Sequence, residues 1–169
     1  MLSCGISSIK TAWYLVRYAK EQRVDVIVIG HNEEQKQNIR IGKQNNQNFV
    51  SIPFCLFIKI LRNTAAKVGI PVVDREESYT SKASLLDLDA IPTYRKGNAQ
   101  TYIFSGKRVH RGLYKTNSGC VINADINGAG NILRKEYPYA FDGQDMSYLY
   151  KTTKVVSYTD IYARAKSVC

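Results

Sequence analysis

Two short apolar runs and the helix expected between them constrain the fold of this chain more than any other feature. In the first, VDVIVIG at 24–30, four consecutive apolar side chains predict a strand that is covered on both faces. The second, IPVVDR at 70–75, predicts another buried strand. The segment at 52–68 has apolar residues at helical spacing, with Pro53 in its first turn. A strand, a crossover helix and a second strand predict a right-handed parallel βαβ unit, and therefore an α/β fold.

An opening helix is predicted at 7–22, with Ser7 or Ser8 as its cap. Gly69 is expected to end the crossover helix. The apolar stripe of the opening helix consists of Ile9, Ala12, Trp13, Val16 and Ala19. The apolar face of the crossover helix consists of Phe54, Phe57, Ile58, Leu61, Ala65 and Val68.

The remaining segments give weaker signals. A last regular helix is predicted at 126–136, ended by Pro138, and a short helix is possible near 157–166. The polar connection at 31–51 is long for a compact domain, which leaves structural filler and nucleic-acid contact as alternatives.

Positive charge is concentrated in one segment of the chain. The net charge is +10, and no acidic residue lies between Asp89 and Asp125. A basic segment that contains tyrosines is typical of nucleic-acid binding, because cations contact phosphates and rings stack on bases. A solvated surface loop is the alternative, and a hairpin with its turn at Ser105 and Gly106 is expected here. The candidate nucleic-acid-binding residues are Lys107, Arg108, Arg111 and Lys115.

Three carboxylates stand where ligands are commonly bound. Glu76 and Glu77 follow the second strand, and α/β proteins bind ligands beyond the carboxyl ends of their strands. Asp125 begins the last predicted helix, where a carboxylate either caps the helix or serves a site. Gly128 and Gly130 favour a site, because helical glycines cost stability unless the helix lies close to the sheet. Asp125 would then approach Glu77, and such a pair suits Mg²⁺ bound with a phosphodiester.

Cysteine usage and hydropathy indicate the cytoplasm. The four cysteines form no CxxC pair, so a disulfide framework is not expected. The opening MLSCGISSIK lacks the apolar core of a signal peptide, and no apolar run has the length of a membrane span. We expect a cytoplasmic, nucleoid-associated protein that has no membrane partner.

Three stretches of the sequence resemble one known family. They are VIVIGHNEEQKQNIRIGKQNNQNFVSIPF, EESYTSKASLLDLD and RVHRGLY…INADINGAGNILRK. They are similar to the C-terminal half of TnpB, the transposon-encoded OrfB proteins related to type V CRISPR effectors. The resemblance implies an RNase H-like (RuvC-like) nuclease domain. In that family three acidic residues bind two metal ions and cut DNA that pairs with a guide RNA.

The resemblance implies a division of the chain into three parts. Residues 1–77 and 123–141 would form the C-terminal part of an incomplete RuvC-like core. A basic, irregular insert at 78–122 would take the place of a zinc ribbon, and 142–169 would be a Tyr-rich tail.

The resemblance also implies roles for single residues. Glu77 in ESYTS matches the second acid and Asp125 in ADINGAGN the third, as catalytic metal ligands, with Glu76 as the fallback for the second. Asn127 and Asn131 would shape the site rather than bind metal. The first acid would belong to a D-x-G type motif upstream of this chain. We therefore expect a fragment that binds Mg²⁺ poorly and cuts little or no DNA alone, and the missing half could be a separate chain.

The position of the family's zinc ribbon lacks the expected cysteines. Ala83 and Ser84 lie around the first cysteine position, and Ser118-Gly119 stands where a Cys-Gly would be, while Cys120 is a lone thiol two residues out of place. Because structural zinc needs four ligands, we expect no zinc and an insert that is held by packing.

Three functions follow as alternatives. The first is the C-terminal fragment of a Mg²⁺-dependent, RNA-guided DNA endonuclease, with DNA and guide RNA as partners. The second is a non-catalytic module that binds nucleic acid through the basic insert and the long polar connection. The third is a decayed remnant with an exposed sheet edge and a tendency to associate.

Overall fold

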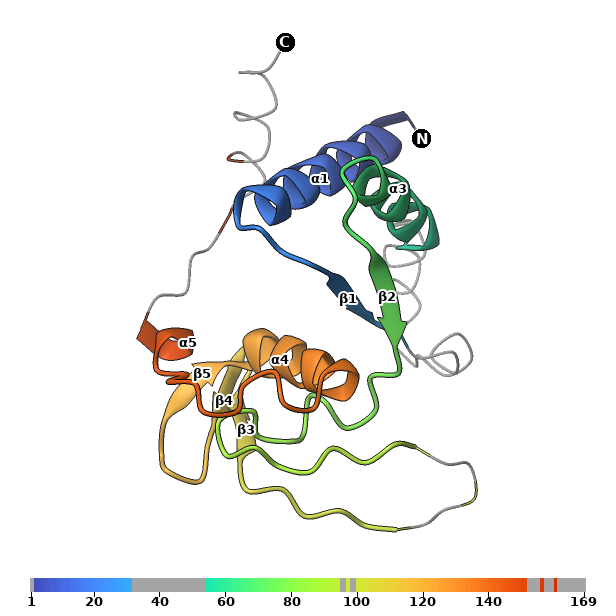
Figure 1. Ribbon diagram of the computed structural model, residues 1–169. Helices are drawn as coiled ribbons and strands as arrows, with labels where there is room; N and C mark the ends of the chain where they lie inside the picture. The colour runs from blue at the N-terminus through green and yellow to red at the C-terminus, as the bar shows by residue number, and fades with distance from the viewer. Residues whose placement is uncertain are drawn as a thin grey trace. The chain divides into compact units, whose positions relative to one another are not determined.

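The computed structural model describes residues 2–31, 54–94, 97, 100–151, 156 and 160 (Figure 1). Most of the predicted connection at 31–51 and of the predicted helix near 157–166 lies outside the described residues. The chain divides into two compact units. The first comprises 1–27, 34–73 and 155–169, and the second comprises 28–33 and 74–154.

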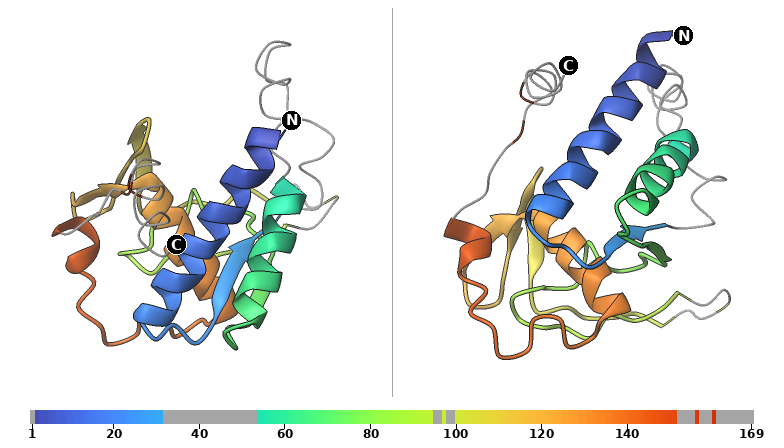
Figure 2. Two further views of the ribbon diagram at one scale, coloured as in Figure 1. Left: turned by 90° about the horizontal axis from the view of Figure 1, so that it is seen from above. Right: turned by 45° about the horizontal axis from the view of Figure 1, so that its top comes forward.

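Two helices form most of the described part of the first unit. Helix α1 spans Leu2–Glu21 and helix α3 spans Phe54–Ala66, and the two lie side by side in both views of Figure 2. The predicted start of α1 at Ser7 or Ser8 is wrong. The Ser7 carbonyl already accepts a hydrogen bond from Thr11 Oγ1 inside the helix, because nothing between residues 2 and 6 breaks the backbone ladder.

The buried face of α1 is rotated slightly from the predicted stripe. Ala12, Val16 and Ala19 are buried as expected, but the side chain of Ile9 is 54% exposed. Tyr14 is buried in its place. Trp13, which was expected in the core, is only half-buried; the Arg17 guanidinium lies 5.5 Å from its ring centroid. The small side chains on the buried face allow the two helices to approach closely.

Helix α3 ends as its sequence predicts. Gly69 follows it with a φ of +79°, the left-handed conformation that glycine adopts without strain. Leu61 and Ala65 form the buried part of its face, whereas Phe54 and Val68 are exposed. The next strand is tied to the helix because Arg62 Nη1 donates a hydrogen bond to the Val72 carbonyl at 2.7 Å.

Strands β1 (Ile27–Gly30) and β2 (Val72–Arg75) pair with each other. The Ile27 amide donates to the Pro71 carbonyl at 3.0 Å, and the His31 amide donates to the Arg75 carbonyl at 2.8 Å. Because both partners advance in the same direction, the strands are parallel, as the βαβ prediction requires. Both strands are half-buried rather than fully covered, since Asp74 is exposed and the other strand residues are intermediate.

The second unit contains a three-stranded antiparallel sheet and helix α4 (Figure 1). Its strands are β3 (Lys107–His110), β4 (Leu113–Lys115) and β5 (Val121–Asn123), in that order. The expected hairpin exists, but its turn lies at 111–112, where Gly112 has a φ of +80°. The predicted turn at Ser105 and Gly106 is therefore wrong.

Gly106 is needed for close packing instead of a turn. A Cβ at this position would lie 2.5 Å from Cε1 of Tyr114. Tyr114 is 1% exposed, stands opposite Ile122 in the sheet and belongs with Ala124 and Leu86 to the core of this unit. Its hydroxyl donates to the Lys82 carbonyl at 2.7 Å. Burial, with smaller contributions from nearby carboxylates, raises the pKa of Tyr114 to about 12, so this hydroxyl keeps its proton.

Helix α4 spans Ala124–Glu136 and contacts β4 and β5, and the short helix α5 spans Tyr148–Lys151. The architecture is therefore mixed α/β with two small sheets, as expected at that level. None of the helices in the described part of the chain is long and apolar enough to cross a membrane.

The two glycines of α4 differ in their surroundings. A Cβ on Gly130 would lie 2.3 Å from Cδ2 of Leu85, so α4 approaches the 80–85 segment too closely for a side chain there. A Cβ on Gly128 would have no described atom within 4 Å. The prediction that glycines permit close approach is therefore right for Gly130, although the neighbour is Leu85 rather than the sheet, and wrong for Gly128.

This difference gives a matched pair of variants. We expect Gly130→Ala to lower the free energy of unfolding by about 1–3 kcal/mol, because Leu85 must move. Gly128→Ala should raise it by up to about 1 kcal/mol, because alanine favours a helix and meets no atom there. Urea unfolding followed by circular dichroism measures both, and equal effects of the two substitutions would contradict the packing described.

Candidate functional site

Helix α4 is capped by Asn123, not by Asp125. The Asn123 side-chain Oδ1 accepts hydrogen bonds from the amides of Asp125 at 2.8 Å and Ile126 at 3.1 Å. Asp125 lies in the first turn and is exposed. The structural interpretation of Asp125 as a cap is therefore wrong. A carboxylate in the first turn still interacts favourably with the helix dipole.

Two buried asparagines of α4 hold the segment that follows Glu77. Asn127 accepts from the Leu85 amide at 2.9 Å and donates to the Ala83 carbonyl at 2.8 Å. Asn131 donates to the carbonyls of Thr80 at 3.0 Å and Ala83 at 2.8 Å. Both asparagines are 0% exposed. We call these contacts the amide clamp; they fix the backbone a few residues after Glu77.

The two adjacent glutamates after β2 have different surroundings. Glu76 forms an ion pair with Lys135 and accepts a hydrogen bond from the Ser78 amide at 2.6 Å. Glu77 points elsewhere. A Cβ on Gly30 would lie 2.6 Å from Oε2 of Glu77 and 2.6 Å from Cδ1 of Ile132. The end of β1, Glu77 and α4 therefore meet at Gly30.

The end of β2 is joined to the end of α4 by a crossed pair of ion pairs. Arg75 pairs with Glu136, and Glu76 pairs with Lys135. The Lys135 side chain is only 7% exposed. In each segment the basic residue precedes the acidic one: Arg75 precedes Glu76, and Lys135 precedes Glu136. Both ion pairs therefore form only in one relative orientation of the two segments. This arrangement sets the direction in which the chain leaves β2.

Glu77 lies beside Ile132, and helical spacing puts Ile132 on the same face of α4 as Asp125. Asp125 and Ile132 are seven residues apart, which is almost two full helical turns and about 10 Å along the helix axis. Helical side chains also lean toward the N-terminus of the helix. The end of the Ile132 side chain, which lies beside Glu77, is therefore nearer to Asp125 along the axis than the Ile132 backbone is. Gly128 lies on this face between them, and no described atom would contact a Cβ there.

These two carboxylates could contribute oxygen ligands to a divalent cation. Among residues 2–31, 54–94 and 100–151, no group of three or more His, Cys, Asp or Glu side chains could hold a metal ion. A third ligand would have to come from elsewhere. The metal-binding role of Glu77 and Asp125 stays a prediction.

Two carboxylates that were not predicted from the sequence hold the insert together. Asp89 accepts hydrogen bonds from the amides of Ser84 at 2.8 Å and Ser105 at 3.0 Å. Asp87 accepts from the Ser84 hydroxyl and from the Asn117 amide at 2.9 Å. These bonds join three separate segments of the insert. The sequence DLD at 87–89 could have indicated this role, because aspartates near serines often accept hydrogen bonds from backbone amides in turns.

The cysteines contribute no cluster to this part of the molecule. Cys55 is an exposed free thiol, and Cys120 is a half-buried free thiol. Ser84, at the expected first cysteine position, is fully buried in the carboxylate network. The absence of zinc stays a prediction.

The four predicted nucleic-acid-binding residues gather on one hairpin. Lys107 and Arg108 belong to β3, Arg111 to the turn and Lys115 to β4, and all four are exposed. Lys107 and Lys115 stand directly opposite each other in the sheet. Like charges in such a pair destabilise a sheet, and an anionic partner would remove the cost. His110 adds an exposed imidazole to the same hairpin.

Together, these features define a mixed α/β protein in which one carboxylate in the first turn of α4 and another beside Ile132 accompany an exposed cationic hairpin. Residues 54–132, a little under half of the chain, match the model of one protein family, which is described as Cas12f1-like, TNB domain. This match supports a relation to the Cas12 and TnpB-related proteins, a group associated with nucleic acids. A search of curated proteins found no match.

The capping geometry predicts that neighbouring substitutions differ in effect. We expect Asn123→Ala to lower the free energy of unfolding by about 1 kcal/mol, because two amides lose their acceptor. Asp125→Asn should leave stability nearly unchanged, since the Asp125 side chain is exposed and does not cap the helix. Urea unfolding curves measure both. A larger loss for Asp125→Asn than for Asn123→Ala would contradict this assignment of the cap.

Proposed function

We propose that the chain is part of a Mg²⁺-dependent, RNA-guided DNA endonuclease of the TnpB type, in which Glu77 and Asp125 are metal ligands. The observation that supports the proposal is that Glu77 lies beside Ile132, which by helical spacing shares a face of α4 with Asp125. Asn123 rather than Asp125 caps the helix, and Glu76 rather than Glu77 forms the ion pair with Lys135.

In this mechanism the chain's own residues bind and orient. The amide clamp and the crossed ion pairs hold the backbone on both sides of Glu77, which limits the loss of entropy when a ligand binds. The bound Mg²⁺ would activate water and stabilise the leaving oxygen of a phosphodiester. The described residues supply two carboxylates to this site, so we expect weak metal binding and little or no cleavage by this chain alone.

The metal-binding role can be tested with Mn²⁺, whose binding is measured by electron paramagnetic resonance. We expect Glu77→Gln and Asp125→Asn each to weaken Mn²⁺ binding by about tenfold or more, because each removes a charged ligand.

Two controls accompany this measurement. Asp142→Asn removes an equally exposed carboxylate from the same unit and should leave Mn²⁺ binding unchanged. Glu76→Gln distinguishes the two adjacent glutamates, and it should have the smaller effect. Mn²⁺ binding that survives Glu77→Gln but fails in Glu76→Gln would transfer the role to Glu76. Binding unaffected by all of these changes would end the proposal.

A second function, a non-catalytic nucleic-acid-binding module, is favoured by the exposed hairpin. Its opposed lysines and neighbouring arginines present cations that would contact phosphates. Binding by such a surface falls steeply with salt and does not require a metal ion. The two functions are compatible, since a nuclease must also bind its substrate.

Charge reversal on the hairpin tests this second function. We expect the double variant Arg108→Glu and Arg111→Glu to weaken DNA binding strongly and to reduce the slope of log affinity against log salt by about one to two. The matched control reverses two exposed lysines of the first unit, Lys20→Glu and Lys67→Glu. Fluorescence anisotropy at several salt concentrations measures both, and equal losses would show that only net charge matters.

A further inference from the structure

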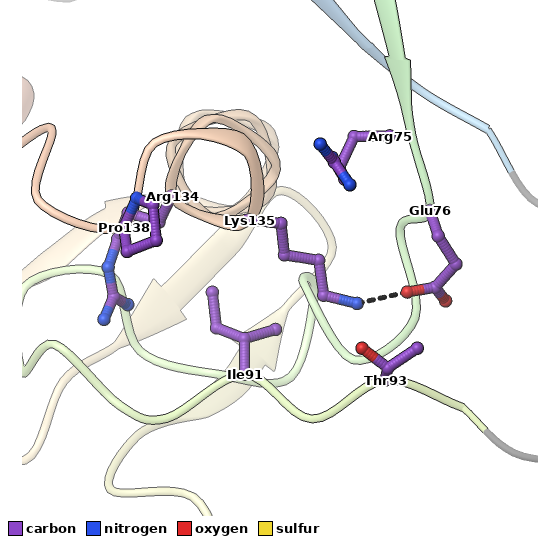
Figure 3. A pocket seen from close by; sticks show the side chains of 7 residues that line it. All are labelled: Arg75, Glu76, Ile91, Thr93, Arg134, Lys135 and Pro138. Carbon is purple, nitrogen blue, oxygen red and sulfur yellow. Dashed lines mark hydrogen bonds and ion pairs between the residues drawn. The ribbon is translucent and has the colours of Figure 1, made fainter.

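A pocket of about 350 Å³ lies in the second unit, and its lining includes neither Glu77 nor Asp125 (Figure 3). Its volume falls at the lower end of the range typical of small-molecule sites. It lies between the end of β2, the end of α4 and the segment at 91–93, three parts of the chain that are distant in sequence. The residues that line it are Arg75, Glu76, Ile91, Thr93, Arg134, Lys135 and Pro138.

The lining carries an excess of positive charge. Three cations, Arg75, Arg134 and Lys135, stand against one carboxylate, Glu76. Outside the lining, Glu136 pairs with Arg75, and Asp89 and Asp142 act electrostatically on Arg134. Because the walls are partly shielded from water, the lining cations act on a ligand more strongly than they would on an open surface. The lining therefore favours an anion.

Arg134 is a partly buried cation whose hydrogen-bond acceptors are neutral groups. Its guanidinium donates to the carbonyls of Leu88 at 3.1 Å and Asp89 at 3.0 Å, and to Asn131 Oδ1 at 3.2 Å. Among the described residues, no carboxylate forms an ion pair with it. Burial accordingly lowers the pKa of Arg134. A bound anion would compensate the charge that burial makes costly.

Lys135 supplies a second cation, and its carboxylate partner can be replaced. The Lys135 side chain is 7% exposed, whereas that of Glu76 is 37% exposed. In Figure 3 the ammonium group of Lys135 points across the pocket to Glu76, and Thr93 lies beside them. An incoming anion would compete with Glu76 for Lys135, and the more exposed Glu76 side chain could turn toward solvent.

We infer that this pocket binds the phosphate group of a nucleotide, with Lys135 and Arg75 as its principal contacts. Cations that converge from two elements suit the several oxygens of a phosphate, and arginine matches them in a fork geometry. Ile91 and Pro138 add an apolar wall on which a sugar or base could pack. The inference does not depend on Glu77 or Asp125, and binding should need no metal ion.

The test uses the full chain and isothermal titration calorimetry with a nucleoside 5′-monophosphate in metal-free buffer. We expect binding of the monophosphate, none of the corresponding nucleoside, and a loss of about tenfold in Lys135→Gln and in Arg75→Gln. Arg75 is the safer variant because its side chain is 42% exposed. Lys67→Gln removes one exposed positive charge from the first unit and should leave the affinity unchanged.

The variant Glu76→Gln distinguishes a binding site from a structural ion pair. Removal of the competing carboxylate should strengthen monophosphate binding, whereas a purely structural pair would make Glu76→Gln as harmful as Lys135→Gln. That result, an equal loss in Lys67→Gln, or the absence of any binding would overturn the inference. Oligonucleotides with and without a 5′-phosphate identify the source of the ligand. Tighter binding of the phosphorylated strand than of the monophosphate would indicate a strand end, and equal binding a free nucleotide.

Discussion

The hydrogen bonds of two fully buried amides, Asn127 and Asn131, are the constraint on which the second unit depends. They satisfy backbone groups of the 80–85 segment that would otherwise be buried without partners, at a cost of about 1–3 kcal/mol for each group. A leucine of the same size would fill the space and leave those groups unpaired. Gly130 makes the arrangement possible, because any side chain there would push Leu85 and its bonded amide away from the helix.

The amide clamp has consequences for both sites proposed above. It holds the backbone just after Glu77, while the crossed ion pairs hold the backbone just before it. Between these two anchors, Glu76 and Glu77 are directed into different surroundings. Glu76 lines the cationic pocket, and Glu77 lies beside Gly30 and Ile132. The two adjacent carboxylates therefore differ in their surroundings. Glu76 forms an ion pair with the buried Lys135, and Glu77 lies beside Ile132 on α4.

The insert shows how a small, loop-rich segment is stabilised by polar contacts. Asp87 and Asp89 accept hydrogen bonds from three segments, and the core beneath them contains the buried ring of Tyr114. Carboxylate acceptors make stronger hydrogen bonds than neutral ones. These interactions give the basic hairpin a firm base, so that its exposed cations project from a defined sheet rather than from an irregular loop.

The sequence by itself determined the features that depend on neighbours in the chain. Helical spacing placed α1, α3 and α4, the glycine at position 69 ended α3, and the apolar runs gave the parallel pair β1 and β2. These are short-range effects of backbone conformation and local burial, and each acts within a few residues. The same local reasoning placed the hairpin turn at Gly106 and the cap at Asp125, because both residues suit those roles in isolation.

Only the tertiary structure decided which of several suitable residues is used. Gly106 is required by the ring of Tyr114, and Asn123 rather than Asp125 accepts the helix amides. Ion pairs across about sixty residues of sequence decide that Glu76, not Glu77, meets Lys135. Periodicity and composition cannot specify such pairings, because the free energy of a contact depends on distance and burial in space, and chain folding alone sets these.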